Sequence, residues 1–147
     1  MLFHGPLPFL MKSIVITFGN FDIFHIGHLN ILRRAKSLGD YLVVGVSTDL
    51  MSLEEKNKET YINEVDRAEI VKSIRYVDEV FFEHSLKNKV EYIKHYQASV
   101  LIMGDDWVGG FDWVKEHCEV NVVYLPRTPN ISTTSIKESL PVGVKRG

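Results

Sequence analysis

His25 and His28, two histidines set three residues apart, are the side chains in this sequence best placed to do chemistry. They stand in the segment 19–28, GNFDIFHIGH, which joins a predicted buried strand to a predicted helix. Two imidazoles so placed can both donate hydrogen bonds to a phosphoryl oxygen and stabilise charge that builds up in a transition state. The turn glycine Gly19 lets the backbone approach a ligand closely, and a helix start attracts an anion. The pattern therefore predicts a reactive, phosphate-binding loop.

Two plainer interpretations of the same histidines are weaker. One is a helix cap beside a surface histidine, which would suit a lone histidine better than the pattern H-x-G-H after a buried strand. The other is a metal site, which is disfavoured because no third ligand is evident in the sequence.

A second polar cluster, ISTT at residues 131–134, opens the last predicted helix. The hydroxyls of Ser132, Thr133 and Thr134 and free backbone N–H groups converge there on a positive helix end. Arg127, just upstream, carries a guanidinium suited to bidentate contact with phosphate oxygens. A plain helix cap explains one hydroxyl but not three beside an arginine. We therefore interpret this cluster as a nucleotide phosphate-binding site.

Charged side chains also follow other predicted strands. Lys56 and Lys58 lie in a charge-rich segment that composition alone would assign to a solvated loop. Asp105 and Asp106 follow a buried strand, and a carboxylate there can accept a hydrogen bond from the amino group of cytosine, which would favour cytosine over uracil. An acidic loop turn is the alternative. The neighbouring Trp107 would shield a base or simply pack.

Arg67 and Arg75 are eight residues apart on one predicted helix, about two turns apart on roughly the same face. Surface arginines paired with nearby acidic side chains are the alternative interpretation.

The elements that must position these residues alternate between strand and helix patterns. Short apolar, β-branched runs predict buried strands, and apolar residues at helical spacing predict helices between them. A parallel sheet covered on both faces follows, so the fold class is α/β, with ligands bound beyond the carboxyl ends of the strands where strand order reverses. The predicted strands are residues 13–18, 41–46, 77–82, 99–103 and 120–125, and the predicted helices are 28–38 (ended by Gly39), 64–75 (capped by Asn63), 87–96, 112–117 and 132–140; residues 50–60 are expected to form a loop or lid.

Composition excludes several classes of protein. The chain has 147 residues, 45% of them hydrophobic and 24% charged, with 17 basic against 19 acidic side chains and a net charge of −2. No global field draws it to nucleic acid, and no apolar run approaches the roughly 18 residues of a membrane span. The single cysteine, Cys118, has no partner for a disulfide or a zinc site and is expected to be structural. Residues 1–10, apolar with two prolines, are expected to be an extension outside the fold, and 11–147 a single domain located in the cytoplasm.

The H-x-G-H motif after the first strand resembles the signature of the nucleotidyltransferase superfamily, whose members move a nucleotidyl group from a nucleoside triphosphate onto a phosphate-bearing acceptor. Four further blocks occur in the same order as in the glycerol-3-phosphate cytidylyltransferases. These blocks are RYVDEV at 75–80, MGDDW at 103–107, YLPRT at 124–128 and ISTT at 131–134. The resemblance covers roughly residues 12–140, nearly the whole chain.

The resemblance implies a Rossmann-like nucleotidyltransferase fold and transfer of CMP from CTP to a small phospho-alcohol, with glycerol 3-phosphate as the expected acceptor. It further implies Mg²⁺ bound with CTP, a homodimer, and products that feed teichoic-acid-like or capsular polymers. No protein ligand is assigned to the metal, and Asp22 is expected to contact it indirectly. The implied catalytic residues are His25, His28, Lys56 and Arg127; the nucleotide-binding residues are Gly19, Asn20, Phe21, Asp22, His25, His28, Lys58, Arg75, Asp106, Arg127, Thr128, Ile131, Ser132, Thr133 and Thr134; the acceptor-binding residues are Lys56, Arg67 and Lys89.

One departure from the family keeps alternatives open. The family usually reads G-T-F-D where this chain has Gly19-Asn20-Phe21-Asp22, and G-N-F-D occurs in the related FAD synthetases. The alternatives are a nucleotidyltransferase of the same fold with another acceptor or base (another CDP-alcohol, a sugar phosphate, or FMN adenylylation), or a nucleotide-binding module without turnover. The downstream blocks fit FAD synthetase poorly.

Overall fold

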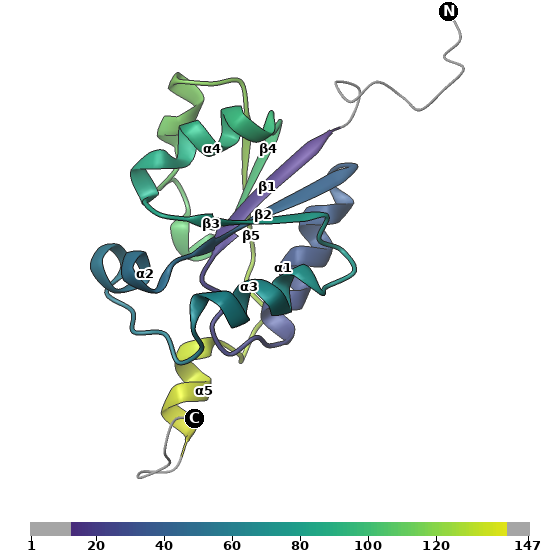
Figure 1. The fold of residues 1–147 in the computed structure, drawn as a ribbon. Helices are drawn as coiled ribbons and strands as arrows, with labels where there is room; N and C mark the ends of the chain where they lie inside the picture. Colours follow the sequence, from purple (N-terminus) through teal and green to yellow (C-terminus); the bar gives the residue numbers. More distant parts are fainter. Residues whose placement is uncertain (1–12, 141–147) are drawn as a thin grey trace, which may run out of the picture.

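The computed structural model describes residues 13–140, and the expected extension at 1–10 lies outside the described residues. Five parallel strands form one sheet in the order β3-β2-β1-β4-β5 (Figure 1). They are β1 (Ile14–Gly19), β2 (Tyr41–Ser47), β3 (Glu79–Glu83), β4 (Val100–Gly104) and β5 (Asn121–Leu125). The predicted fold class is confirmed, and each predicted strand is present to within two residues at either end.

Strand order reverses beside β1, because the chain builds β1, β2 and β3 outward to one side and then crosses to lay β4 against the other. The register pairs Thr17 of β1 with Val44 of β2 and Ile102 of β4. The loops after β1 and β4 therefore leave the same edge of the sheet and diverge, which opens a crevice at that edge.

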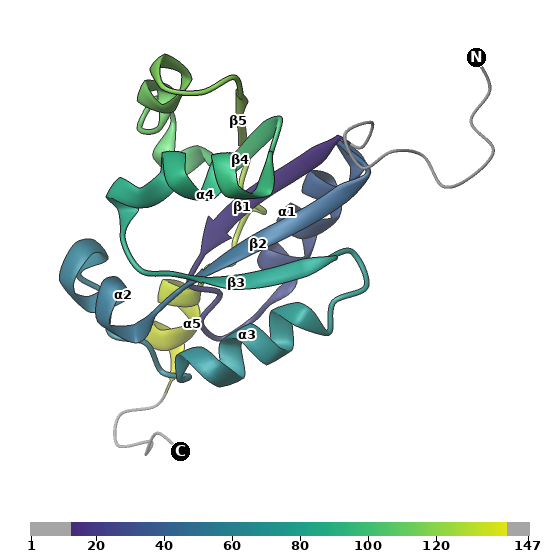
Figure 2. The ribbon, with the colours of Figure 1, turned by 45° about the horizontal axis from the view of Figure 1, so that its top comes forward.

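Helices cover both faces of the sheet (Figure 2). One face packs against α1 and α3, with Leu32, Ala35 and Val71 fully buried. The other face packs against α4 and a short turn, with Ile93 and Val114 buried. The helices are α1 (Ile26–Ser37), α2 (Asp49–Lys56), α3 (Glu64–Lys72), α4 (Lys89–Tyr96) and α5 (Thr133–Ser139), with 3₁₀ turns at Leu86–Asn88, Asp105–Trp107 and Asp112–Glu116.

The prediction of a loop at residues 50–60 is wrong for residues 50–56, because residues 49–56 form the helix α2. Thr48 caps this helix by accepting the N–H of Met51 at 3.1 Å, and Asn57 ends it in the left-handed conformation, with φ of 52°. Met51 is the buried apolar side chain of α2. Because α2 is short and buries little apolar surface, its sequence shows no apolar residues repeated at helical spacing.

Two helix predictions also differ from the structure at their ends. The first helix begins at Ile26 rather than at His28, because His25 supplies its cap. The helix predicted over 64–75 ends at Lys72, so Arg67 and Arg75 do not share a helix. Gly39 does follow α1, but its φ lies outside the left-handed region; a side chain there would instead come within 2.7 Å of the Ser13 carbonyl oxygen.

Candidate active site

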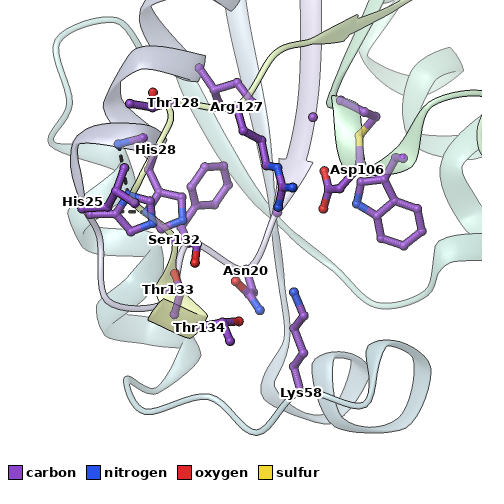
Figure 3. Close-up of a pocket in the computed structure, with 18 of the residues that line it drawn as sticks. Asn20, His25, His28, Lys58, Asp106, Arg127, Thr128, Ser132, Thr133 and Thr134 are labelled. Carbon is purple, nitrogen blue, oxygen red and sulfur yellow. Dashed lines mark hydrogen bonds between the residues drawn. The ribbon is translucent and has the colours of Figure 1, made fainter. Parts of the chain in front are cut away.

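A cavity of about 590 Å³ opens beyond the carboxyl ends of β1 and β4, where strand order reverses. Cavities of this size are typical of small-ligand sites. Its walls come from the loop after β1, the first turn of α1, the end of α2, the loop after β4 and the segment from β5 into α5 (Figure 3). The predicted site residues that line it are Gly19, Asn20, Phe21, His25, His28, Lys56, Lys58, Asp106, Arg127, Thr128, Ile131, Ser132, Thr133 and Thr134.

The two histidines are held as hydrogen-bond donors. The Nδ1 atom of His25 accepts the backbone N–H of Gly27 at 3.0 Å, which caps α1. The Nδ1 atom of His28 accepts the backbone N–H of His25 at 3.1 Å. Because each Nδ1 accepts a hydrogen bond, each neutral ring carries its proton on Nε2. The rings stack with their centroids 3.8 Å apart, so two N–H donors lie side by side at the cavity wall.

Both imidazoles are neutral at physiological pH. Burial, helped by the neighbouring His25 and opposed by Asp22, lowers the pKa of His28 from 6.5 to about 3. Burial also lowers the pKa of His25. The pair therefore offers directional N–H groups without adding a positive charge. The helix cap of the plainer interpretation is also present: His25 caps α1, and this capping bond fixes the His25 tautomer.

The backbone of the loop before the histidines is strained. Phe21 and Ile23 both adopt left-handed backbone conformations, with φ of 54° and 48°. Bulky and β-branched residues rarely do so, and such strain persists where surrounding packing enforces it. Phe21 is buried against the His28 ring at 5.4 Å between centroids, and any side chain at position 19 would meet its ring at 3.0 Å. Gly19 is therefore required for close approach.

Asp22 ties the loop after β1 to residues 61–62 and to α5, but it does not line the cavity itself. Its buried carboxylate accepts the backbone N–H groups of Tyr61 and Ile62 at 2.8 and 2.9 Å and pairs with Lys137 of α5 at 3.0 Å. Its carbonyl oxygen accepts the Thr133 hydroxyl at 2.7 Å. Burial raises the pKa of Asp22, but the two N–H donors and Lys137 outweigh it, so the net pKa lies below its usual value.

Helix α1 also fixes the wall that carries Arg127. Asn30 donates to the Thr128 hydroxyl at 2.9 Å, and Arg34 donates to the Pro126 carbonyl at 3.0 Å. The Nε atom of Arg127 lies 3.4 Å from the Asp105 carboxylate, and the Arg127 side chain is 63% exposed, so it remains accessible to a ligand. Arg127 reaches across the cavity mouth toward Asp106, and Lys58 points into the cavity from the opposite wall (Figure 3).

Comparison with known proteins identifies this arrangement. The family model for cytidylyltransferase-like proteins matches residues 16–139. The chain belongs to the cytidylyltransferase-like family. It is 52% identical over 126 residues to the glycerol-3-phosphate cytidylyltransferase of Bacillus subtilis (strain 168), covering 86% of this chain and 95% of the relative. It is 44% identical over 126 residues to the same enzyme of Staphylococcus aureus (strain NCTC 8325 / PS 47), covering 86% and 93%.

A solved structure shares the fold. The lipopolysaccharide core biosynthesis protein from Thermoplasma volcanium GSS1 superposes with a TM-score of 0.68 at 24% identity, covering 80% of this chain and 98% of that one. At this identity the likeness supports the Rossmann-like architecture of the cytidylyltransferase-like family and nothing finer.

Two arginines that the family resemblance implicated lie outside the cavity. Arg67 is 1% exposed; it donates to the backbone carbonyls of Asn20 and Ser47 at 2.6 and 2.9 Å and pairs with Asp49. It therefore acts on the cavity through the backbone of the loop after β1. Arg75 is exposed beyond the end of α3, where its guanidinium donates to the hydroxyl of the next residue, a tyrosine.

The two lysines of the implied acceptor site differ in position. Lys56 lines the cavity and donates to the Ser47 hydroxyl at 2.6 Å. Burial lowers its pKa to about 8, although Glu83 opposes the shift. Lys89 does not line the cavity: it is fully buried, it pairs with Glu83, and its ammonium lies 3.7 Å from the centroid of the Phe18 ring.

The hydroxyl cluster at the start of α5 is partly engaged within the protein. Ser132 caps α5 by accepting the N–H of Ser135 at 3.0 Å, and Thr133 donates to the loop after β1. The two residues still line the cavity, together with Thr134. The Ser132 hydroxyl therefore caps α5 and the Thr133 hydroxyl bonds the loop after β1, so fewer hydroxyls are free to bind phosphate.

Sequence reasoning missed five polar residues of the cavity: Thr17, Asn30, Glu55, Glu59 and Lys137. Lys137 lies four residues after Thr133 in α5, so helical spacing could have placed the two side chains on one face. Asn30 lies two residues after His28 in α1, and the sequence carries no signal for its long-range bond to Thr128.

A family of this chemistry implies a divalent metal. Within residues 13–140 no group of three histidine, cysteine or carboxylate side chains is arranged to hold an ion. Mg²⁺ keeps several waters and is commonly held through substrate phosphates rather than by an all-protein cage, so this donor set fits an ion that arrives with the nucleotide. No helix in the same range is long and apolar enough to cross a membrane.

Proposed function

We propose that this protein transfers CMP from CTP to the phosphate of glycerol 3-phosphate, giving CDP-glycerol and pyrophosphate. The observation that carries the proposal is the pair of neutral, stacked histidines whose Nε2–H groups lie at a cavity also lined by Lys56, Lys58 and Arg127. Relatives at 44–52% identity that bear the name glycerol-3-phosphate cytidylyltransferase support the choice of nucleotide and acceptor.

The reaction needs no nucleophile from the protein. An oxygen of the acceptor phosphate attacks the α-phosphorus of CTP in line; the new P–O bond forms as the bond to the bridging oxygen breaks, and pyrophosphate leaves. A phosphate monoester is largely dianionic at pH 7, because its second pKa is about 6, so no general base is required. His25 and His28 donate to the oxygens on which charge accumulates, and the cationic side chains neutralise the triphosphate and the acceptor.

The low pKa of His28 fits this role. Because its pKa is about 3, His28 is a neutral imidazole at pH 7 and not an imidazolium, so it is poorly suited to act as a general acid. Its fixed Nε2–H is suited to stabilising charge by position alone. Asp106 on the far side of the cavity is the carboxylate we assign to the amino group of cytosine.

Two further parts of the proposal come from the family. Mg²⁺ bound through the triphosphate would neutralise charge on the departing pyrophosphate. Chelation with EDTA should then abolish turnover, and added Mg²⁺ should restore it. The second part is a homodimer, for which light scattering should return twice the chain mass; a monomer mass for active enzyme would refute it.

The test is pyrophosphate release with Mg²⁺, comparing CTP, ATP, UTP and GTP, each with and without glycerol 3-phosphate. Release with CTP and glycerol 3-phosphate together supports the proposal. Release with CTP and another phospho-alcohol would replace the acceptor. Preference for ATP would favour the FAD synthetase-like alternative that Asn20 raises.

A second comparison separates an enzyme from a binding module. His28→Ala should keep CTP affinity and lose about 10²–10³ in turnover, the cost of removing one positioned donor. His84→Ala, which removes an exposed histidine outside the cavity, is the matched control. Equal turnover in the two variants would refute the catalytic role.

A further inference from the structure

Asn30 of α1 links two parts of the cavity wall that lie far apart in the sequence. Its side-chain nitrogen donates to the Thr128 hydroxyl at 2.9 Å, and its side-chain oxygen accepts from Arg33, which follows three residues later in the same helix. Asn30 and Thr128 are half-buried, whereas Arg33 is exposed. Thr128 lines the cavity together with its neighbour Arg127 (Figure 3). A chain of hydrogen bonds therefore runs from the surface of α1 to the cavity.

The direction of these hydrogen bonds is set by Arg33. A guanidinium carries donors and no acceptor, so the group of Asn30 that meets it is the amide oxygen. The amide nitrogen of Asn30 must then face Thr128, and an amide nitrogen can only donate. A second contact, with the Tyr76 hydroxyl, also holds the Arg33 guanidinium. The Thr128 hydroxyl therefore accepts a hydrogen bond from Asn30 and cannot give one to it.

This direction leaves the proton of the Thr128 hydroxyl available. A hydroxyl has one O–H donor and two acceptor lone pairs, of which Asn30 occupies one lone pair. Within residues 13–140 the Thr128 hydroxyl makes no other hydrogen bond. Because Thr128 lines the cavity, an oxygen of a ligand bound there can accept this proton. Hydrogen bonds in a chain polarise one another, so a hydroxyl that already accepts is the better donor.

We propose that Arg33 and Asn30 are positioning residues that fix the Thr128 hydroxyl as a hydrogen-bond donor to a phosphate oxygen of the bound nucleotide. The identity of that ligand rests on the proposed function. Ionised phosphate oxygens only accept hydrogen bonds, so a Thr128 that had given its proton to a neighbour would turn lone pairs toward an anion. Arg33 acts at one remove from the ligand, since it does not line the cavity.

The experiment reverses the direction of the bond without removing the contact. Asn30→Asp keeps the size of the side chain and its partner Arg33, but a carboxylate only accepts, so the Thr128 proton turns toward it. The value of kcat/KM for CTP should fall by about 10- to 100-fold, as expected for the loss of a hydrogen bond to a charged group. Asn30→Ala leaves the hydroxyl free to rotate and should cost less, about threefold. A purely structural role predicts the opposite order, with aspartate tolerated better than alanine, and that result would overturn the proposal.

A double-mutant cycle separates the direction of the bond from the added negative charge. Thr128→Val removes the hydroxyl and should cost about as much as Asn30→Asp, and the two losses should not add. If Asn30→Asp costs as much in the Thr128→Val background as in the wild type, its effect is one of charge alone and the proposal is wrong. Asn121→Asp, which places the same charge on an exposed asparagine outside the cavity, is the matched control.

A second readout needs no turnover. The side-chain amide signals of Asn30 in heteronuclear NMR spectra of the full chain can be assigned by their loss in Asn30→Ala. These signals should shift in Thr128→Val, which removes the acceptor, and in Arg33→Met, which frees the amide to turn. Signals that stay in place in both folded variants would contradict the proposal. If the wild type releases no pyrophosphate with any nucleotide, the proposed function fails, while these signals still decide whether Asn30 donates to Thr128.

Discussion

Replacing His28 with asparagine should remove much of the acid sensitivity of this fold. The Oδ1 atom of an asparagine can take the place of the His28 Nδ1, which accepts the His25 N–H at 3.1 Å, so the capping bond survives. The substitution removes a group that cannot be protonated without cost in the folded state, because burial and the adjacent His25 lower the pKa of His28 to about 3.

The magnitude follows from the difference between the two states. An unfolded histidine titrates near 6.5, so between pH 6.5 and 3 the unfolded chain binds a proton that folded His28 does not. Stability from neutral His28 is therefore fully present above pH 6.5 and falls as the pH drops. At pH 5, 1.5 units below 6.5, the loss is about 2 kcal/mol at 1.36 kcal/mol per unit. The figure is set by the unfolded pKa, because pH 5 lies well above the folded pKa of about 3.

The assay is urea unfolding at pH 8, 6 and 5 for the wild type, His28→Asn and the control His84→Asn. The free energy of unfolding of the wild type should fall between pH 8 and 5 by about 2 kcal/mol more than that of His28→Asn. Wild type, His28→Asn and His84→Asn losing the same free energy would refute a neutral, buried His28 and, with it, the assigned tautomers.

Three other perturbations give separable outcomes. Asp22→Asn leaves Lys137 without its buried anion and should lower the free energy of unfolding by about 3 kcal/mol in urea; Lys137→Met should cost less, and the two losses should not add. Gly45→Ala puts a carbon within 2.7 Å of two phenylalanine rings and should lower the free energy of unfolding by about 1–3 kcal/mol, measured as a lower Tm with KM unchanged. Lys56 has a pKa of about 8, so KM for its anionic substrate should rise about tenfold per pH unit above 8, and Lys56→Arg should flatten that profile.

The sheet was predictable because its central strands, β1, β2 and β4, are buried on both faces. Runs such as residues 41–46 are continuously apolar and β-branched, and little else in a chain of this size produces that pattern. The short helix α2 was not predictable, since it depends on one cap and one buried methionine. Its charged residues gave the composition of a loop although they form a helix.

The site was predictable where its residues sit in one continuous motif. Six residues of the segment 19–28 line the cavity, from one loop and one helix start, so their spacing carries the geometry. The sequence could not show that Arg67, Arg75 and Lys89 lie outside the cavity. Whether a charged side chain faces a ligand or a buried partner depends on elements far along the chain. Lys89 and Glu83 come from α4 and β3, and nothing in their spacing indicates that they pair.

The cavity divides its work between neutral donors and cations, and this division explains why the two histidines can lie so close together. Imidazolium rings with centroids 3.8 Å apart would repel each other and the nearby lysines, whereas neutral rings add hydrogen-bond direction at no electrostatic cost. In the proposed function, the positive charge that a triphosphate requires would come instead from Lys56, Lys58 and Arg127, on separate walls. The backbone N–H of His25, which holds the His28 tautomer, is therefore as important to this arrangement as the ring that it holds.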